Sequence, residues 1–379
     1  MSKVYLPRAD QFDLMNENLA KIANAIGSDI DISTWAGIQK AVRAGIAPDI
    51  IPVGTQLSVS HSSYGSLLFD VVAHNYFKSA HDGNAHTMTL MCHDVIRSLQ
   101  YDAPEAFYYA DVELPAGTYH FTIPTTYESW NAGTYQFTLN SALPAGGQLC
   151  IYDTSATSME NARVALHRSR TTAADGQTTI VPITLGDGGT NLGTFGVELN
   201  HTRRVGGGSD NYGESAIRQF LNSSGDVGDV WTPQTKFDRT PTWNGTVRGF
   251  AHGLDTDFLA VIGEVVVPCG ANTVYESPDS TTTIGKKYTV KDKFYLASAR
   301  EIMGDATSSV DDGTVQFTYY NGADAVDRVK FTSGTPSSWW TRSPYKTLPA
   351  VVQDITGVGN ITSHYPSHSF GISPVCTIV

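Results

Sequence analysis

A tryptophan pair near the C-terminus places the strongest constraint on the fold. Trp339 and Trp340 stand side by side in the low-charge stretch Trp339-Trp340-Thr341-Arg342-Ser343-Pro344-Tyr345. Two adjacent indoles bury a large apolar area. We expect Arg342 to stack against them and Ser343-Pro344 to form a fixed turn. The apolar last residues, 373–379, predict that the chain ends in a paired strand.

The composition favours strands and turns and excludes several classes of protein. The 379 residues suffice for two or three domains. Lys and Arg number 25 against 37 Asp and Glu, so the net charge is −12, which argues against binding to nucleic acid and against a polybasic membrane-surface protein. Charged residues make up only 16%, whereas Gly (35) and Tyr (18) are plentiful, as is typical of strands and turns. We expect no membrane insertion and no signal peptide, hence synthesis in a cytoplasm.

The N-terminal segment has the clearest helical pattern. Its apolar residues recur at spacings of 3, 4, 3 and 4, and Gly27 and Ser28 end the pattern. Such a heptad seam predicts a helix that joins chains, and isoleucines late in the seam favour a trimer over a dimer. The alternative is an amphipathic helix that packs on its own domain. The seam consists of Phe12, Met15, Leu19, Ile22 and Ile26.

Shorter elements follow along the chain. Residues 33–47 predict a second helix capped by Ser33 or Thr34, and Pro48 and Pro52 are expected to end this helical region. Alternating or continuous apolar runs predict strands, and one apolar stripe at Ile217, Phe220 and Leu221 predicts a helix. The expected strands are 56–61, 67–73, 87–91 and 293–298, and the further helices are 214–222 and 299–304, with 258–267 read as a helix end or a buried strand.

A near-repeat marks a different kind of segment. The sequence Ala-Gly-Thr-Tyr-His-Phe-Thr-Ile at 116–123 returns as Ala-Gly-Thr-Tyr-Gln-Phe-Thr-Leu at 132–139, with Tyr and Phe on one strand face and Thr on the other. Two such strands predict an inserted β-sandwich module at 102–198. The rest divides into an N-terminal helical segment, 1–48, and a larger domain made of 49–101 and 199–379.

Motifs for catalysis or metal binding are missing. His61, His74, His81, His86 and His93 lack HExxH or H-x-H spacing, so we interpret them as structural. The cysteines, Cys92, Cys150, Cys269 and Cys376, are far apart and are expected to be buried thiols. There is no GxSxG elbow, phosphate loop or GxGxxG before a helix. Carboxylates are many, and a glycosidase pair among them stays open.

The C-terminal motif resembles the formylglycine-enzyme-like branch of the C-type-lectin fold. The matching residues are the Trp-Trp-x-Arg-Ser-Pro-Tyr stretch above and Gly371-Ile372-Ser373-Pro374-Val375-Cys376. This resemblance implies an α+β fold: a C-type-lectin-like domain that carries the inserted β-sandwich and an N-terminal helical oligomerisation segment. The oxidase activity of that branch needs a reactive cysteine arrangement, and Cys269 and Cys376 are isolated in sequence.

The whole chain is also similar to the variable proteins of diversity-generating retroelements, including tropism determinants of gut phages. Those systems mutate template adenines, and the resulting pyrimidine-ending codons cannot encode Lys, Glu, Gln, Met or Trp. From Thr347 to Val379 the sequence contains none of these except Gln353. A short, low-charge segment that lacks them by chance is the alternative.

The resemblance implies a variable binding face held by a constant frame. The frame would be Trp339, Trp340, Arg342, Pro344, Gly371 and Pro374. Tyr, Phe, His, Ser and Asn are residues that adaptable binding sites use, and we expect the exposed, varied set to be Leu348, Ala350, Asp354, Thr356, Asn360, His364, Tyr365, Ser367, His368 and Phe370. Val352, Ile355 and Ile361 are expected to face inward.

We therefore expect a non-enzymatic receptor-binding protein of a phage tail or virion, built as a homotrimer. It would bind a protein or glycan on a bacterial surface and need no cofactor and no metal. The alternatives are a fixed carbohydrate-binding adhesin, which the missing signal peptide and the missing Glu-Pro-Asn sugar motif disfavour, and a structural tail protein.

Overall fold

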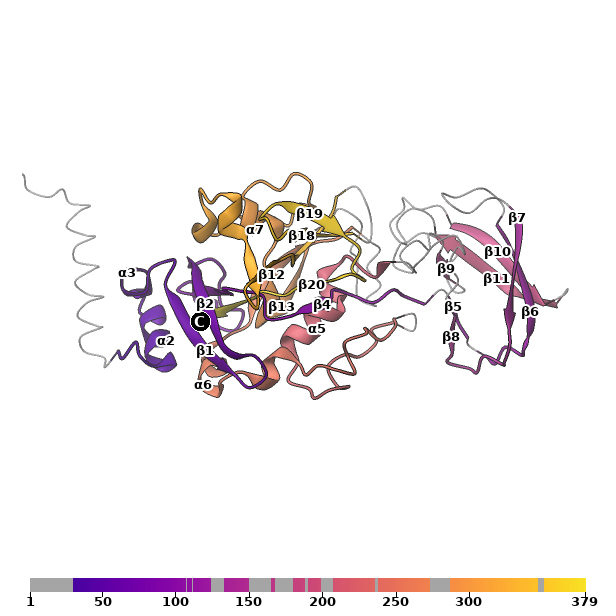
Figure 1. The fold of residues 1–379 in the computed structure, drawn as a ribbon, viewed down its shortest axis with the longest axis horizontal. Helices are drawn as coiled ribbons and strands as arrows, with labels where there is room; N and C mark the ends of the chain where they lie inside the picture. The colour runs from indigo at the N-terminus through magenta and orange to yellow at the C-terminus, as the bar shows by residue number, and fades with distance from the viewer. Residues whose placement is uncertain are drawn as a thin grey trace, which may run out of the picture.

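Two five-stranded sheets organise the main body of this α+β protein, which is mostly sheet with few helices (Figure 1). The computed structural model describes residues 30–106, 108–110, 112–123, 133–149, 165–167, 180–187, 190–198, 207–235, 238–272, 287–346 and 351–379. The predicted N-terminal helix and its seam lie outside these residues, as does Cys150.

The first sheet places the end of the chain in its interior. Its strands are antiparallel and follow the order β1 (Gln56–His61), β2 (Gly65–His74), β3 (Met88–Cys92), β21 (Pro374–Ile378) and β14 (Phe294–Leu296). All five residues of β3 and all five of β21 are buried. The prediction of a paired C-terminal strand is therefore confirmed.

The second sheet contains the tryptophan pair. Its order is β19 (Ile361–His364), β18 (Val352–Ile355), β17 (Trp339–Pro344), β20 (Ser369–Gly371) and β4 (Ser98–Gln100). β17 and β20 run parallel, with Trp339 opposite Gly371, and the other neighbours are antiparallel. Every residue of β17 and β18 is buried.

Short helices and hairpins cover these sheets. α2 packs against α6, where the Trp35 and Phe258 rings lie 4.8 Å apart. The α-helices are α2 (Trp35–Arg43), α3 (Ala47–Ile50), α5 (Ala216–Asn222), α6 (Thr256–Val261) and α7 (Ala299–Met303). The 3-10 helices are η2 (Tyr212–Glu214), η3 (Phe250–Gly253), η4 (Thr318–Tyr320) and η5 (Ala325–Arg328). The hairpins are β12 (Val265–Gly270) with β13 (Lys287–Asp292), and β15 (Lys330–Thr332) with β16 (Thr335–Ser337).

Most of the predicted elements are present. One prediction, that Pro48 ends the helical region, is wrong, and the position of Pro48 at a helix start explains why. Thr34 caps α2 by accepting a hydrogen bond from the Gly37 amide at 3.1 Å. Pro48 does not end the helical region as expected. It lies in the first turn of α3, where its missing N–H costs no hydrogen bond. The stretch 258–267 contains both elements that we considered, because α6 ends at Val261 and β12 begins at Val265.

The near-repeat forms an antiparallel pair. β6 (Gly117–Ile123) and β7 (Gly133–Leu139) align along their whole length, with Tyr119 opposite Phe137 in the backbone register. They belong to the sheet β7-β6-β10-β11-β9, completed by β10 (Ile180–Asp187), β11 (Thr190–Glu198) and β9 (Ala165–His167), and a two-stranded ladder joins β5 (Tyr108–Tyr109) to β8 (Gln148–Leu149). Among the described residues these strands pair only with one another, and they lie to the right of the main body in Figure 1. The exact domain boundaries stay predictions.

Three described cysteines are buried free thiols, as expected: Cys92, Cys269 and Cys376. No helix in the described residues is long and apolar enough to cross a membrane.

Candidate functional site

The two tryptophans form a buried and fully hydrogen-bonded base for the site. Both side chains have 0% exposure. The Trp339 Nε1 donates to the Arg328 carbonyl at 3.2 Å, and the Trp340 Nε1 donates to the Leu99 carbonyl at 3.1 Å. Since each indole N–H has a partner, burial leaves no donor unsatisfied. The predicted role of the pair as part of the frame agrees with this position.

Arg342 is part of the frame through an ion pair and not through tryptophan stacking. Its guanidinium donates to both carboxylate oxygens of Glu301, at 2.6 and 2.8 Å, and both side chains have 0% exposure. It also donates to the carbonyls of Leu296 and Pro268, and it lies 5.8 Å from the Tyr295 ring. A buried guanidinium requires a counter-charge and several acceptors, which two indoles do not supply. The stacking prediction was therefore wrong.

Ser343 and Pro344 do not form a turn. They continue β17, and Pro344 stands opposite Val352 after an irregularity in the ladder that begins at Trp340. A proline has no backbone N–H to donate to a neighbouring strand. It is therefore tolerated where the hydrogen bonding between two strands is already interrupted.

Gly371 and Pro374 complete the frame. A Cβ on Gly371 would lie 2.6 Å from the Val95 side chain and 2.9 Å from the Ser338 carbonyl. Pro374 opens β21 opposite Leu296. The parallel contact between β20 and β17 thus depends on the absence of a side chain at position 371.

Four half-buried rings lie over this frame, and we call them the aromatic face: His364, Tyr365, His368 and Phe370. The His364 and Phe370 rings are 4.7 Å apart, the two histidine rings 5.5 Å, and the Tyr365 and His368 rings 6.4 Å. Phe370 also contacts the buried Trp340, with ring centroids 4.8 Å apart. All four belong to the predicted set, and the structure brings them together.

Asp354 was predicted to be exposed and is instead buried. It lies on β18 between β17 and β19, and its carboxylate accepts a hydrogen bond from His364 Nδ1 at 2.8 Å. Burial raises the pKa of Asp354 above its ordinary value, and the neighbouring His364 offsets part of that rise. The carboxylate orients one ring of the aromatic face from below. We therefore place Asp354 in the frame.

The other predicted residues divide between a turn and a loop. Thr356 and Asn360 close the turn between β18 and β19 through two mutual hydrogen bonds of 2.8 and 3.1 Å, with Asn360 exposed. Ser367 is half-buried beside the aromatic face. Leu348 and Ala350 lie outside the described residues. Val352 and Ile355 face inward as expected, and Ile361 is partly buried.

Sequence reasoning missed the segments that anchor the loop of the aromatic face. The amides of Tyr101 and Asp102 donate to the Pro366 carbonyl at 2.9 and 3.1 Å, and the Ser367 amide donates to the Gly207 carbonyl at 3.0 Å. Tyr101 and Asp102 lie just before the β-rich segment between β4 and α5, and Gly207 lies just after it. The only sequence signal was the change of pattern at 101–102.

The aromatic face presents aromatic rings and imidazole nitrogens at the surface. The rings offer apolar area and polar edges. Asp354 occupies the Nδ1 of His364, and the Nε2 forms no hydrogen bond with a described residue. In the described part of the chain, no group of three or more His, Cys, Asp or Glu could hold a metal ion. Elsewhere His61 and His74 bond to backbone carbonyls and His93 to Asp70, in line with structural roles.

Residues 195–379 match a family described as a domain of unknown function (DUF6273). No curated protein and no solved structure matches the chain. The matched part includes all ten residues of the predicted varied set and all six of the frame.

Proposed function

We propose that this chain is a non-enzymatic receptor-binding protein of a phage tail or virion, and that its aromatic face contacts a protein or glycan on a bacterial surface. The observation that carries the proposal is the aromatic face itself, in which four half-buried rings rest on a buried frame. Clustered aromatic and imidazole side chains on an ordered scaffold are typical of adaptable binding sites.

The separation of face and frame supports variation at this site. Trp339, Trp340 and Arg342 are at most 1% exposed, whereas the rings of the aromatic face are only partly buried. Substitutions at these partly buried positions cost less than substitutions in the buried frame, because large free-energy losses come from buried cavities and unpaired charges. Phe370, which packs on Trp340, and His364, which pairs with Asp354, are the costlier positions of the four. A binding surface can then change while the fold persists.

Gln353 adds support from the codon pattern. It is the single residue in 347–379 that diversified codons cannot encode. Its side chain is 1% exposed, and its Nε2 donates to the Ser308 hydroxyl at 2.6 Å. The residue that breaks the codon rule thus belongs to the frame and not to the face. We propose on this basis that the gene segment is the target of a diversity-generating retroelement.

The proposal includes a C-type-lectin scaffold of the formylglycine-enzyme-like branch. The final strand pairs inside the first sheet, and the Trp-Trp-x-Arg stretch lies in the second, so both C-terminal motifs are built into the core. An oxidase role fits less well. Burial raises the pKa of the Cys269 thiol to about 12 and that of Cys376 well above its ordinary value, which disfavours reactive thiolates.

A fixed carbohydrate-binding adhesin is the second candidate, because aromatic rings also pack against sugars. The two candidates differ in whether the face varies among related genomes. Sequencing amplicons of the 3′ end of this gene in its source population distinguishes them.

We expect substitutions to cluster at Asn360, His364, Tyr365 and His368 and to spare Trp339, Trp340 and Gly371. Frequencies along the 5′ two thirds of the gene serve as the internal control. A uniform 3′ end, or substitutions spread evenly along the gene, would refute diversification and favour the adhesin.

A further inference from the structure

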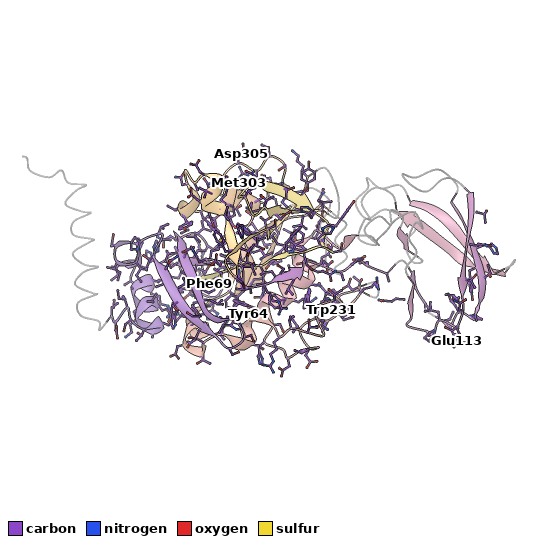
Figure 2. The ribbon with its side chains drawn as sticks, in the orientation of Figure 1. Tyr64, Phe69, Glu113, Trp231, Met303 and Asp305 are labelled. Carbon is purple, nitrogen blue, oxygen red and sulfur yellow. The ribbon has the colours of Figure 1, made fainter. Side chains whose placement is uncertain are left out.

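A second concave site lies away from the aromatic face. It is a cavity of about 240 Å³ between the β1–β2 turn, the residues before β4 and the segment 246–249. We call it the arginine pocket, and its polar lining consists of His61, Ser63, Tyr64, Arg97, Thr246 and Arg248. Tyr64 lies at the lower side of the main body in Figure 2, whereas β18 and β19 lie toward the upper side in the same view in Figure 1.

Arg97 enters this pocket without a counter-charge. Its side chain forms no ion pair and no hydrogen bond with any described residue, and its Nε is buried. A buried donor without an acceptor costs free energy, and a charged one costs more. Arg342 and Arg218, by contrast, are satisfied by Glu301 and Asp292. The terminal nitrogens of Arg97 also lack a described partner and are not enclosed as Nε is, so an oxyanion in the cavity would pair with them.

The lining has a positive charge on an acidic protein. It includes two arginines and no carboxylate, although the whole chain has a net charge of −12. Arg248 pairs with Asp226 at 2.7 Å, outside the lining, where both side chains are more than half exposed. Arg97 is therefore the cation left for an anionic group.

The opposite wall is rigid and neutral. His61 is 4% exposed, contacts the Phe250 carbonyl through Nε2 at 2.9 Å, and accepts from the Ser63 amide at 3.0 Å. Its ring lies between Tyr64, at 4.5 Å, and Phe250, at 5.5 Å. Burial lowers the pKa of His61, which keeps it uncharged near neutral pH. The half-buried Tyr64 ring is thus held in place beside the cavity.

We propose that the arginine pocket binds an acidic monosaccharide. The carboxylate would pair with Arg97, the sugar ring would pack on Tyr64, and the hydroxyls of Ser63 and Thr246 would bond to the sugar hydroxyls. Arg binds carboxylates through two parallel hydrogen bonds, and the cavity volume suits one sugar ring. This site does not depend on the function proposed for the aromatic face.

Titration calorimetry of the full chain tests the proposal with glucuronate, glucose and inorganic phosphate as probes. We expect glucuronate to bind, and glucose, which carries a hydroxymethyl group in place of the carboxylate, to bind at least about tenfold more weakly. Arg97→Gln should weaken glucuronate binding at least about tenfold, and Arg97→Lys should weaken it less. Lys291→Gln, which removes a charge from the exposed side of β13, is the matched control and should leave binding unchanged.

Undetectable binding of glucuronate, or equal binding by Arg97→Gln, would overturn the proposal. Equal affinity for phosphate and glucuronate would overturn the sugar assignment and indicate a simple oxyanion site. If Arg97→Gln fails to fold by circular dichroism, Tyr64→Ala replaces it, because loss of the packing ring should also weaken glucuronate more than phosphate.

Discussion

At the scale of single residues, Arg342 is the residue on which the frame depends most. Its guanidinium is buried with Glu301 at 2.6 and 2.8 Å, and Asp312 lies 3.7 Å away. Burial raises the pKa of Glu301, and the charge of Arg342 offsets part of that rise. Glu301 also closes the capping box of α7, so one carboxylate joins the helix to β17.

Glu301→Gln should lower the free energy of unfolding by about 3–5 kcal/mol, because it removes the close carboxylate of a buried arginine and leaves only Asp312, at 3.7 Å, as a counter-charge. Asp311→Asn is the control. Asp311 pairs with Lys287 and Arg300, but its side chain is 55% exposed, so the loss should stay within about 1 kcal/mol. Urea unfolding of the two variants measures the difference, and equal losses would contradict a structural role for the buried pair.

His61 should make the stability of the fold depend on pH. Burial lowers its pKa in the folded state below the ordinary value of 6.5. The unfolded chain then binds more protons below about pH 6.5, so the free energy of unfolding falls as the pH falls through this range. His74 acts in the same direction, since burial lowers its pKa too.

Urea unfolding at several pH values between about 5 and 7.5 should show this loss. His61→Gln should reduce the slope of the free energy of unfolding against pH. His74 should account for part of the slope that remains. An unchanged slope in His61→Gln would show that His61 does not titrate in the expected direction.

At the scale of elements, the turn between β18 and β19 sets the position of the aromatic face. Gly359 in this turn has φ +80°, and a Cβ there would clash with the Ala325 carbonyl of η5. Arg328 from the same 3-10 helix donates to the Gly359 carbonyl at 3.1 Å. η5 therefore supports the turn from behind.

Gly359→Ala should destabilise the protein more than Gly322→Ala. Gly322 has a similar φ of +77° but open space where a Cβ would lie. In both variants the left-handed backbone lowers the free energy of unfolding by about 1–2 kcal/mol. Only Gly359→Ala also introduces a clash with a carbonyl. Thermal unfolding compares the two variants. Equal melting temperatures would show that η5 can shift away from the added Cβ without a loss of stability.

At the scale of the whole molecule, the aromatic face is one copy of a site that the sequence predicts to be present three times. The heptad seam from Phe12 to Ile26 is the basis for this expectation. Three linked copies would raise the overall affinity through effective concentration, even where each face binds its receptor weakly.

A chain that begins at Ile30 should be monomeric, whereas the full chain should have three times its own chain mass in solution. Light scattering after size-exclusion chromatography measures both. Leu19→Asp within the full chain is a milder variant that should dissociate the trimer, because it places a charge in the seam. A monomeric full chain would instead support the amphipathic helix packed on its own domain.

The sequence by itself determined the local features. Cap residues, periodicity and turn residues act over a few positions, so α2, α5, α7 and the strands from β1 to β3 followed from them. The aromatic residues between the tryptophan pair and Gly371 could be identified as a candidate face for the same reason. Errors arose where the local pattern allows several surroundings, at Pro48, Arg342, Pro344 and Asp354.

Only the tertiary structure decided those surroundings. The burial of Asp354 depends on β17 and β19 flanking β18, and the partner of Arg342 comes from α7, which lies 41 positions away in sequence. The arginine pocket likewise joins residues from 61 to 249. Such contacts are set by the pairing of strands that are far apart in sequence. The spacing of residues along the chain does not specify which distant side chains come into contact.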